Sequence, residues 1–207
     1  MSTHRQTLKD ALTHLEKADP RLAPLLSKHA CRLEREADFE PFHALARAIA
    51  HQQLHGKAAE TILGRFVDKV GKGKFPTPLQ VKRARMTTLR ACGFSTAKSL
   101  ALKDLAAKRL DGTIPDAVHL HAMKDDEVVE RLISVRGVGR WTVEMMLMNR
   151  MGRLDVLPAD DFGVRKGFTV LYGKRAMVTK KALLKHGERW RPFRSVASWY
   201  MWRVLEK

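Results

Sequence analysis

Apolar residues recur every three or four positions along most of this chain, and this spacing restricts the possible folds more than any other feature. In segment 5–17, Leu8, Leu12 and Leu15 lie about one helical turn apart among polar residues. Pro41 suits the first turn of a helix, and the apolar face of the helix that it opens comprises Phe42, Leu45, Ala46, Ile49 and Ala50. No segment clearly alternates between apolar and polar residues, as a half-buried strand does. The sequence therefore predicts an all-α fold.

Segments that contain Gly or Pro separate the expected helices. The helical run after Gly56 ends near Val70, and the Gly- and Pro-rich segment 71–78 must be a loop. Beyond this loop we expect helices at 79–91, 95–110, 125–134, 140–151, 160–172, 176–187 and 192–205.

The charge balance indicates a polyanionic partner. Among 207 residues, 39 are Lys or Arg and 22 are Asp or Glu, which gives a formal net charge of +17 at pH 7. Nucleic acid is the commonest partner of so basic a surface. No apolar run approaches the ~20 residues that span a bilayer, and the first residues, MSTHRQTLKDALTH, contain no apolar segment of a signal peptide. We therefore expect a soluble, cytoplasmic protein, associated with the nucleoid if it is bacterial, and no membrane partner.

Metal-binding side chains are scarce. Cys31 and Cys92 are the two cysteines, which excludes a disulfide scaffold and a four-cysteine metal site. His51 and His55 have the spacing of a helical metal pair, but no Glu lies between them and no third ligand is evident. The sequence therefore predicts neither a zinc site nor a cofactor.

A short segment with two glycines connects two expected helices within about 126–151. After the apolar stripe of Val128, Leu132 and Ile133 comes the segment VRGVG, and a second helix opens at Arg140. Glycines allow a sharp turn and the close approach of another molecule, and the free N–H groups of a helix N-terminus bind anions. A DNA phosphate could therefore reach the amides of Gly137 and Gly139, although an ordinary tight turn between helices has the same pattern.

Two adjacent carboxylates follow about twenty residues later, in the segment LPADDF that contains Asp160 and Asp161. They come directly before an expected helix, where Asp is usually an N-cap. One carboxylate can cap the helix while the other takes part in chemistry.

These motifs together resemble the helix-hairpin-helix, Gly/Pro-Asp (HhH-GPD) superfamily of DNA glycosylases. Within it, the segments AIAHQQLHGKAA, GRWT, LPADDFGVRKGF and WRPFRSVASWYMW resemble the 3-methyladenine DNA glycosylase II group, in the expected order over about 40–207. The resemblance implies two helical lobes. Residues 40–153 form one, with the hairpin at about 126–151, and residues 1–39 with 154–207 form the other, which carries the catalytic Asp.

The resemblance also implies an activity. A monofunctional glycosylase of this group hydrolyses the N-glycosidic bond of alkylated bases in duplex DNA and so initiates base excision repair. The family's catalytic carboxylate falls on Asp161, which would stabilise the oxocarbenium-like charge on the sugar. Trp141 stands where the strand-cleaving branch of the superfamily has a lysine nucleophile, so no strand cleavage is expected. We expect a monomer, because one lesion needs one pocket.

Aromatic residues form the base pocket that the resemblance implies. Trp141, Phe162 and Trp202 would give an electron-rich pocket that favours a cationic, flipped-out base. Met145 stands where some relatives have an aromatic residue, so the pocket shape can differ. From the residues alone, Trp141 is equally compatible with a place in the core.

Two segments of the family's DNA-binding surface have counterparts here. Gln53, Leu54 and His55 resemble the loop that enters the minor groove, where Leu54 would fill the gap that the flipped nucleotide leaves. Buried core is an equally good interpretation of Leu54. The phosphate-binding residues carried over from the hairpin are Gly137, Gly139 and Arg140.

Three points remain open from the sequence. Family hairpins can hold a monovalent cation through backbone carbonyls, which here fall on Ile133, Val135 and Val138. A non-catalytic helix-hairpin-helix module that binds DNA or lesions would share the hairpin and the charge, and Asp161 beside an aromatic pocket favours the enzyme over it. A glycosylase for other bases, such as deaminated purines or uracil, is a further alternative.

Overall fold

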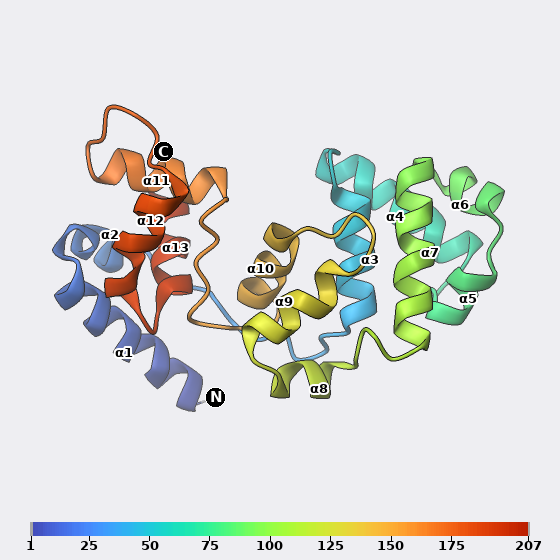
Figure 1. Ribbon diagram of the computed structural model, residues 1–207, viewed down its shortest axis with the longest axis horizontal. Helices are drawn as coiled ribbons and strands as arrows, with labels where there is room; N and C mark the ends of the chain where they lie inside the picture. Colours follow the sequence, from blue (N-terminus) through green and yellow to red (C-terminus); the bar gives the residue numbers. More distant parts are fainter. Residues whose placement is uncertain (1, 207) are drawn as a thin grey trace. The chain divides into compact units, whose positions relative to one another are not determined.

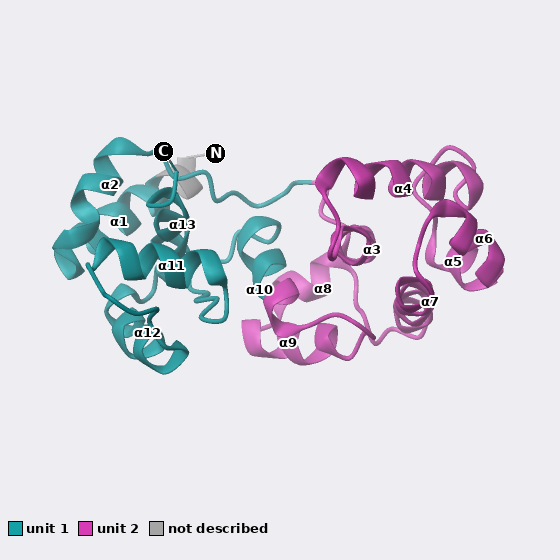
Figure 2. Ribbon diagram, turned by 90° about the horizontal axis from the view of Figure 1, so that it is seen from above, with its two compact units in different colours: residues 1–37, 144–207 teal, residues 38–143 magenta. Residues whose placement is uncertain are grey.

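The computed structural model describes residues 2–206, and every regular element in this range is a helix (Figure 1). The all-α prediction is thereby confirmed. The chain divides into two compact units, with residues 1–37 and 144–207 in unit 1 and residues 38–143 in unit 2 (Figure 2). The sequence-based division placed the second boundary at 153, whereas the structure places it inside a helix, α10 (Arg140–Asn149).

Unit 1 combines the two ends of the chain. Its core includes Leu15, Leu22, Trp190 and Tyr200, all fully buried. Besides the end of α10, its helical elements are α1 (Ser2–Ala18), η1 (Pro20–Leu22), α2 (Ala23–Lys28), α11 (Phe162–Leu171), α12 (Lys180–Gly187), η2 (Glu188–Trp190) and α13 (Arg194–Arg203).

Helices α11 and α13 pack directly against each other inside unit 1. A Cβ atom built on Gly167 of α11 would lie 1.9 Å from the Met201 carbonyl oxygen of α13, so a side chain at this position would collide with backbone. The absence of a side chain at Gly167 therefore permits the close contact between these helices.

A buried carboxylate connects the first helical segment of unit 1 to its later helices. Asp19 is 2% exposed and accepts hydrogen bonds from Trp190 Nε1 at 2.8 Å and from the Tyr172 hydroxyl, and it pairs with His186 Nε2 at 2.8 Å. Burial by itself raises the pKa of Asp19, but the hydrogen bonds from His186, Tyr172 and Trp190 outweigh it and lower that pKa to about 2.

Unit 2 is built around α7 (Thr96–Leu110), which packs against α3 (Pro41–His51) and α5 (Pro78–Arg83). Its core includes the fully buried residues Phe42, Phe66 and Leu102. The other helices of the unit are α4 (Gly56–Lys69), α6 (Met86–Cys92), α8 (Ala117–Ala122), α9 (Asp125–Ile133) and the start of α10.

The structure differs from the expected helices in four places, one of which is that the helix expected at 176–187 begins at Lys180. The helix expected at 79–91 is broken into α5 and α6, and Lys103 of α7 donates to the carbonyls of Lys82, at 2.7 Å, and Ala84 at the end of α5. Helix α8 is additional, and its N-cap Asp116 accepts from the His119 amide at 2.9 Å. Helical segments also fill 20–28, where Pro20 and Pro24 occupy first-turn positions that tolerate proline.

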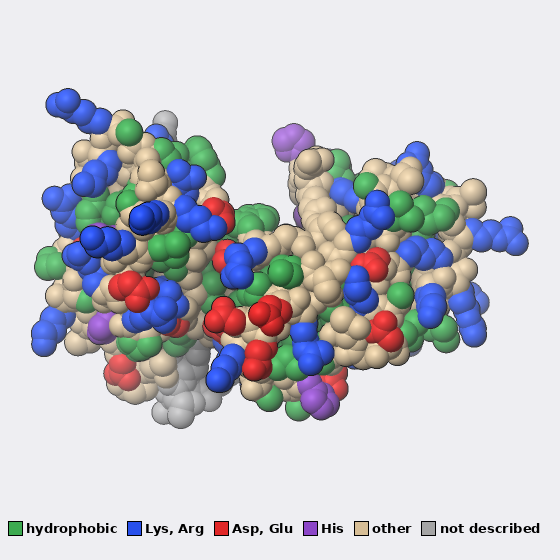
Figure 3. Space-filling model, viewed as in Figure 1, with side chains coloured by type: hydrophobic (Ala, Val, Ile, Leu, Met, Phe, Trp, Pro, Cys, Tyr) green, Lys and Arg blue, Asp and Glu red, His purple; other side chains and the backbone are tan. Residues whose placement is uncertain are grey.

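Basic side chains are spread over the visible face of each unit, with acidic side chains interspersed (Figure 3). Among the residues that the structure describes, no helix has the length and apolar character needed to cross a membrane.

Candidate functional site

Asp161 is a buried carboxylate at the N-terminus of α11. It is 8% exposed and is the N-cap of this helix. Its Oδ1 atom accepts one hydrogen bond from the Val164 amide at 2.7 Å and another from the indole Nε1 of Trp202 at 2.9 Å. Two N–H groups from different helices therefore fix the orientation of the carboxylate.

Trp202, near the end of α13, contacts Asp161 through its N–H edge. The intervening residue, Gly163, makes this approach possible. A Cβ atom built on Gly163 would lie 2.8 Å from Trp202 Cδ1 and 3.1 Å from Asp161 Oδ1. The sequence predicted only the aromatic face of Trp202 as functional, and it did not indicate this hydrogen bond between residues 41 positions apart.

Asp160 has a different environment from that of its neighbour. Its side chain is 52% exposed and forms an ion pair with Lys180, whose side chain is half exposed. A solvated surface ion pair of this kind contributes little to stability. The structure thus separates the two adjacent carboxylates into a surface residue and a buried, doubly anchored one.

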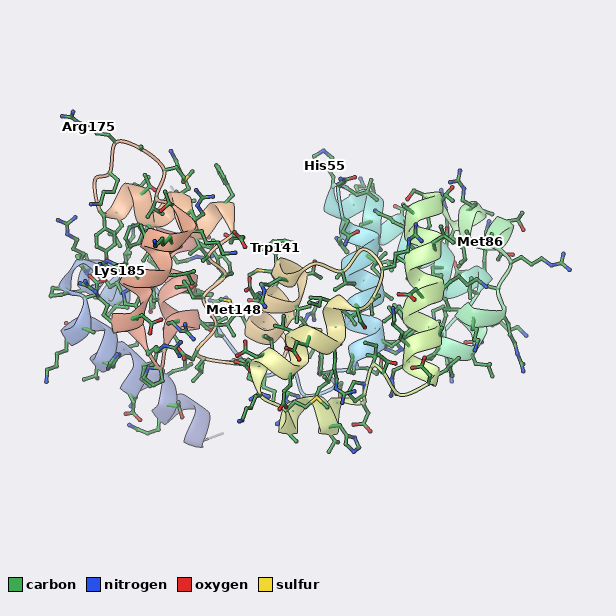
Figure 4. All side chains as sticks on the ribbon, in the orientation of Figure 1. His55, Met86, Trp141, Met148, Arg175 and Lys185 are labelled. Carbon is green, nitrogen blue, oxygen red and sulfur yellow. The ribbon has the colours of Figure 1, made fainter. Side chains whose placement is uncertain are left out.

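Two of the predicted pocket aromatics are exposed. Phe162, the first residue of α11 in unit 1, is 70% exposed. Trp141, the second residue of α10, is 49% exposed and belongs to unit 2 (Figure 4). A core position for Trp141 is therefore excluded. Met145, four residues further along α10, is partly buried and belongs to unit 1. An exposed aromatic side chain does not contribute the free energy that its burial would add to folding. Trp141 and Phe162 are therefore candidates for ligand contact.

The predicted hairpin is present in unit 2. It connects the end of α9 at Ile133 to the start of α10 at Arg140, and the Val138 amide donates to the Val135 carbonyl at 3.0 Å. Gly137 has φ +76°, a left-handed conformation that favours glycine. A Cβ atom on Gly139 would have no other atom within 4 Å, apart from its own local backbone. The hairpin therefore has an open approach at Gly139.

The loop between α3 and α4 is the second predicted DNA-contacting segment. Leu54 is 40% exposed, which excludes the interpretation of this residue as buried core. Gln53 has a left-handed φ of +54°, and His55 projects from the tip of the loop (Figure 4). All three residues, Gln53 to His55, are exposed.

Four polar residues that sequence reasoning missed tie the hairpin and this loop to α7. Lys98 Nζ donates to the carbonyls of Ala50 and Gln52, and the Gln52 side chain donates to the Gly137 carbonyl. Further along α7, Asp104 accepts from the Arg136 amide at 2.7 Å and Lys108 Nζ donates to the Ser134 carbonyl at 2.5 Å. No local pattern could reveal partners so distant along the chain.

One of the three carbonyls predicted to hold a monovalent cation has a hydrogen-bond partner in the hairpin. The Val135 oxygen already accepts the Val138 amide, and the Lys108 ammonium lies on the adjacent Ser134 carbonyl. A cation at Ile133, Val135 and Val138 stays a prediction, because a carbonyl oxygen that accepts one amide keeps a second lone pair. Within residues 2–206, no cluster of three or more His, Cys, Asp or Glu side chains could hold a metal ion.

Comparisons with known proteins agree with this organisation. A family described as the HhH-GPD superfamily of base excision DNA repair proteins matches residues 46–192. The chain is 40% identical to DNA-3-methyladenine glycosylase 1 of Schizosaccharomyces pombe over 201 residues, which cover 96% of this chain and 88% of the relative.

Solved structures of similar proteins have the same fold. The Schizosaccharomyces pombe 3-methyladenine DNA glycosylase Mag1, in complex with abasic DNA, gives a TM-score of 0.79 at 39% identity, over 94% of this chain and 95% of that one. A DNA-3-methyladenine glycosidase from Bacillus halodurans gives a TM-score of 0.84 at 32% identity, over 95% of this chain and 89% of that one.

Proposed function

The chain belongs to the HhH-GPD superfamily of base excision DNA repair proteins, and we propose that it is a monofunctional DNA glycosylase for alkylated bases in duplex DNA. The observation that carries this proposal is the buried Asp161 carboxylate, held by the Val164 amide and the Trp202 indole. The enzyme acts as a monomer, because one extruded nucleotide occupies one pocket.

Asp161 stabilises the transition state through its negative charge. Cleavage of the N-glycosidic bond develops positive, oxocarbenium-like charge on the sugar, and a nearby carboxylate stabilises it and can orient or deprotonate the attacking water. The electron pair of the bond leaves with the base, and water supplies the new oxygen on the anomeric carbon. An alkylated base that carries a positive charge departs readily, so a strong general acid is not needed.

Trp141, the residue after Arg140, supports a mechanism without a covalent intermediate. Glycosylases that also cut the strand use an amine nucleophile that forms a Schiff base with the sugar. Trp141 has no amine, and its half-exposed indole instead offers a surface for stacking against a flipped base. Phe162, which follows Asp161 in unit 1, is also an exposed aromatic. The product is an intact strand with an abasic site.

Two segments of unit 2 hold the DNA. The N-terminus of α10, which begins at Arg140 directly after the open Gly139, binds a backbone phosphate. The exposed loop residues Gln53, Leu54 and His55 enter the groove beside the lesion, where Leu54 fills the space of the extruded nucleotide. The net charge of +17 favours association with duplex DNA of any sequence.

The names of the relatives favour the enzyme over the non-catalytic module that the sequence left open. A binding module also needs no buried carboxylate anchored by a tryptophan at the end of a second helix.

The direct test is incubation of the purified protein with methylated duplex DNA, followed by chromatography of the released bases. We expect free alkylated purines and a strand that breaks only after heating in alkali. Binding to the duplex without release of any alkylated base would contradict the proposal and favour the non-catalytic module. Duplexes with uracil or deaminated purines test the other enzyme alternative.

A further inference from the structure

The loop 53–55 and the hairpin 134–139 are separate in sequence, yet side chains join them within unit 2. We propose that Gln52 and Lys98 are positioning residues that couple phosphate binding at the hairpin to insertion of the loop into DNA. This inference rests on the proposed function, because it assigns the loop and the hairpin to DNA. It adds a mechanical connection between the phosphate contact of the hairpin, which does not depend on DNA sequence, and the extrusion of a base.

Lys98 fixes the start of the loop. The last carbonyls of a helix lack partners within the helix and carry the negative end of its dipole. Lys98, in the first turn of α7, donates from Nζ to the carbonyls of Ala50 at 2.8 Å and Gln52 at 2.7 Å, at the end of α3. Partial burial lowers the pKa of this ammonium. Lys98 therefore sets where α3 ends and where the loop begins.

Gln52 continues the connection to the hairpin. Its side-chain Nε2 donates to the Gly137 carbonyl at 2.8 Å, across 85 positions of sequence. Gln53, directly after it, has a left-handed φ of +54°, a conformation that a non-glycine residue keeps only where its surroundings hold it. The loop thus starts from a residue that is fixed on both its backbone and its side chain.

The same helix also holds the hairpin. Asp104 accepts from the Arg136 amide at 2.7 Å, Lys108 donates to the Ser134 carbonyl at 2.5 Å, and the two side chains pair at 2.7 Å. Asp104 and Lys108 lie four residues apart and so share one side of α7, the helix whose first turn carries Lys98. The loop and the hairpin therefore share one rigid support.

This arrangement has a functional consequence. Once the hairpin has bound a phosphate, the position of the loop relative to that phosphate is determined. Entry of the loop into the duplex therefore costs little conformational entropy. Without the Gln52 and Lys98 hydrogen bonds, the hairpin would still bind phosphate, but the loop would sample other positions. Affinity for undamaged DNA and efficiency of base extrusion then become separable.

Lys103 provides a matched control on the same helix. It donates from Nζ to the carbonyls of Lys82 and Ala84 at the end of α5, and burial lowers its pKa as it does for Lys98. The chemistry is the same, but no proposed DNA-contacting segment follows α5. Lys98→Met and Lys103→Met should therefore cost similar stability and differ in function.

The experiment compares wild type, Lys98→Met, Gln52→Met and Lys103→Met in the full chain. The readouts are Tm, the Kd for undamaged duplex, single-turnover release of methylated bases, and the fluorescence of 2-aminopurine next to an abasic site, which increases when neighbouring bases unstack. We expect Lys98→Met and Gln52→Met to lower both the release rate and the fluorescence change about tenfold. The net free energy of one hydrogen bond corresponds to roughly a factor of ten in a rate or equilibrium constant. The Kd of these two variants for undamaged duplex should stay within about twofold of wild type, because the hairpin still binds phosphate. Lys103→Met should match wild type in release and fluorescence.

Two results would overturn the coupling: wild-type release and fluorescence in both Lys98→Met and Gln52→Met, or an equal loss in Lys103→Met. If Lys98→Met unfolds, Gln52→Met decides, because it removes one donor and leaves the carbonyls at the end of α3 paired. If the wild-type protein releases no alkylated base, the proposed function is wrong, and the fluorescence comparison on abasic duplex still decides whether the loop and the hairpin are coupled.

Discussion

Replacement of Trp202 by Phe removes one of the two N–H donors directed at Asp161 Oδ1 and keeps an aromatic ring at the end of α13. The carboxylate is buried, so water does not readily replace the lost donor. Removal of one partner from a buried acceptor costs roughly 1–3 kcal/mol. If this energy keeps the carboxylate aligned with the developing charge, the rate of the chemical step falls by roughly 5- to 150-fold.

The assay is single-turnover release of alkylated bases at saturating enzyme, with KM measured separately. We expect Trp202→Phe to lower the chemical rate while KM changes little, because the phenyl ring still offers a face for stacking. Trp199→Phe is the matched control. Trp199 lies on the same helix, is buried, and packs against Tyr200 and Arg203. This control should lose stability without a comparable loss of chemical rate.

Three results would refute the reasoning about Trp202. The first is a chemical rate within twofold of wild type, and the second is a change in KM alone. The third is an equal loss of rate in Trp199→Phe, which would show a general effect of disturbing α13.

Three other predictions follow from the structure. Asp161→Asn should lower base release at least about 100-fold with duplex affinity retained, since one electrostatic stabiliser contributes on this scale. Asp160→Asn should resemble wild type, and the reverse result would show that Asp160 is the catalytic carboxylate. Borohydride should trap no covalent complex during base release, because Trp141 has no amine; efficient trapping coupled to release would identify another lysine as nucleophile. The depressed pKa of Asp19, about 2 in the folded protein against 3.8, contributes about 2 kcal/mol that is present above pH 4 and lost as pH falls towards 2. Thermal unfolding of Asp19→Asn should therefore depend less steeply on pH in that window, and an unchanged slope would contradict this assignment.

Local patterns in the sequence were enough to predict the main helices and the hairpin. The hairpin depends on neighbouring residues, namely the glycines of Gly137-Val138-Gly139 and the helix signals on each side. An Asp before an apolar helical run predicts an N-cap, but this pattern did not distinguish Asp160 from Asp161, and the choice of Asp161 as the catalytic residue came from the family resemblance. The expectation that one carboxylate caps the helix and the other takes part in chemistry did not anticipate that Asp161 itself is the N-cap.

Interactions between distant residues explain what the sequence did not reveal. At the break between α5 and α6, the last carbonyls of α5 accept hydrogen bonds from Lys103 of α7, a partner that the local helical pattern does not reveal. The Trp202 hydrogen bond to Asp161 and the Gln52 hydrogen bond to Gly137 join residues 41 and 85 positions apart. Periodicity and motif spacing carry no information about such pairs, so the support of the site was visible only in the structure.

The two sides of α11 differ in how freely they can evolve. Gly163 and Gly167 lie on the side that meets α13, where an added Cβ would displace Trp202 or collide with the Met201 carbonyl. Phe162, Lys166 and Val170 recur every four residues on another side and are all exposed. Substitutions on the exposed side leave the anchoring of Asp161 intact. Selection, or a laboratory library restricted to positions 162, 166 and 170, can therefore vary the exposed side of this helix while the Asp161 carboxylate stays in place.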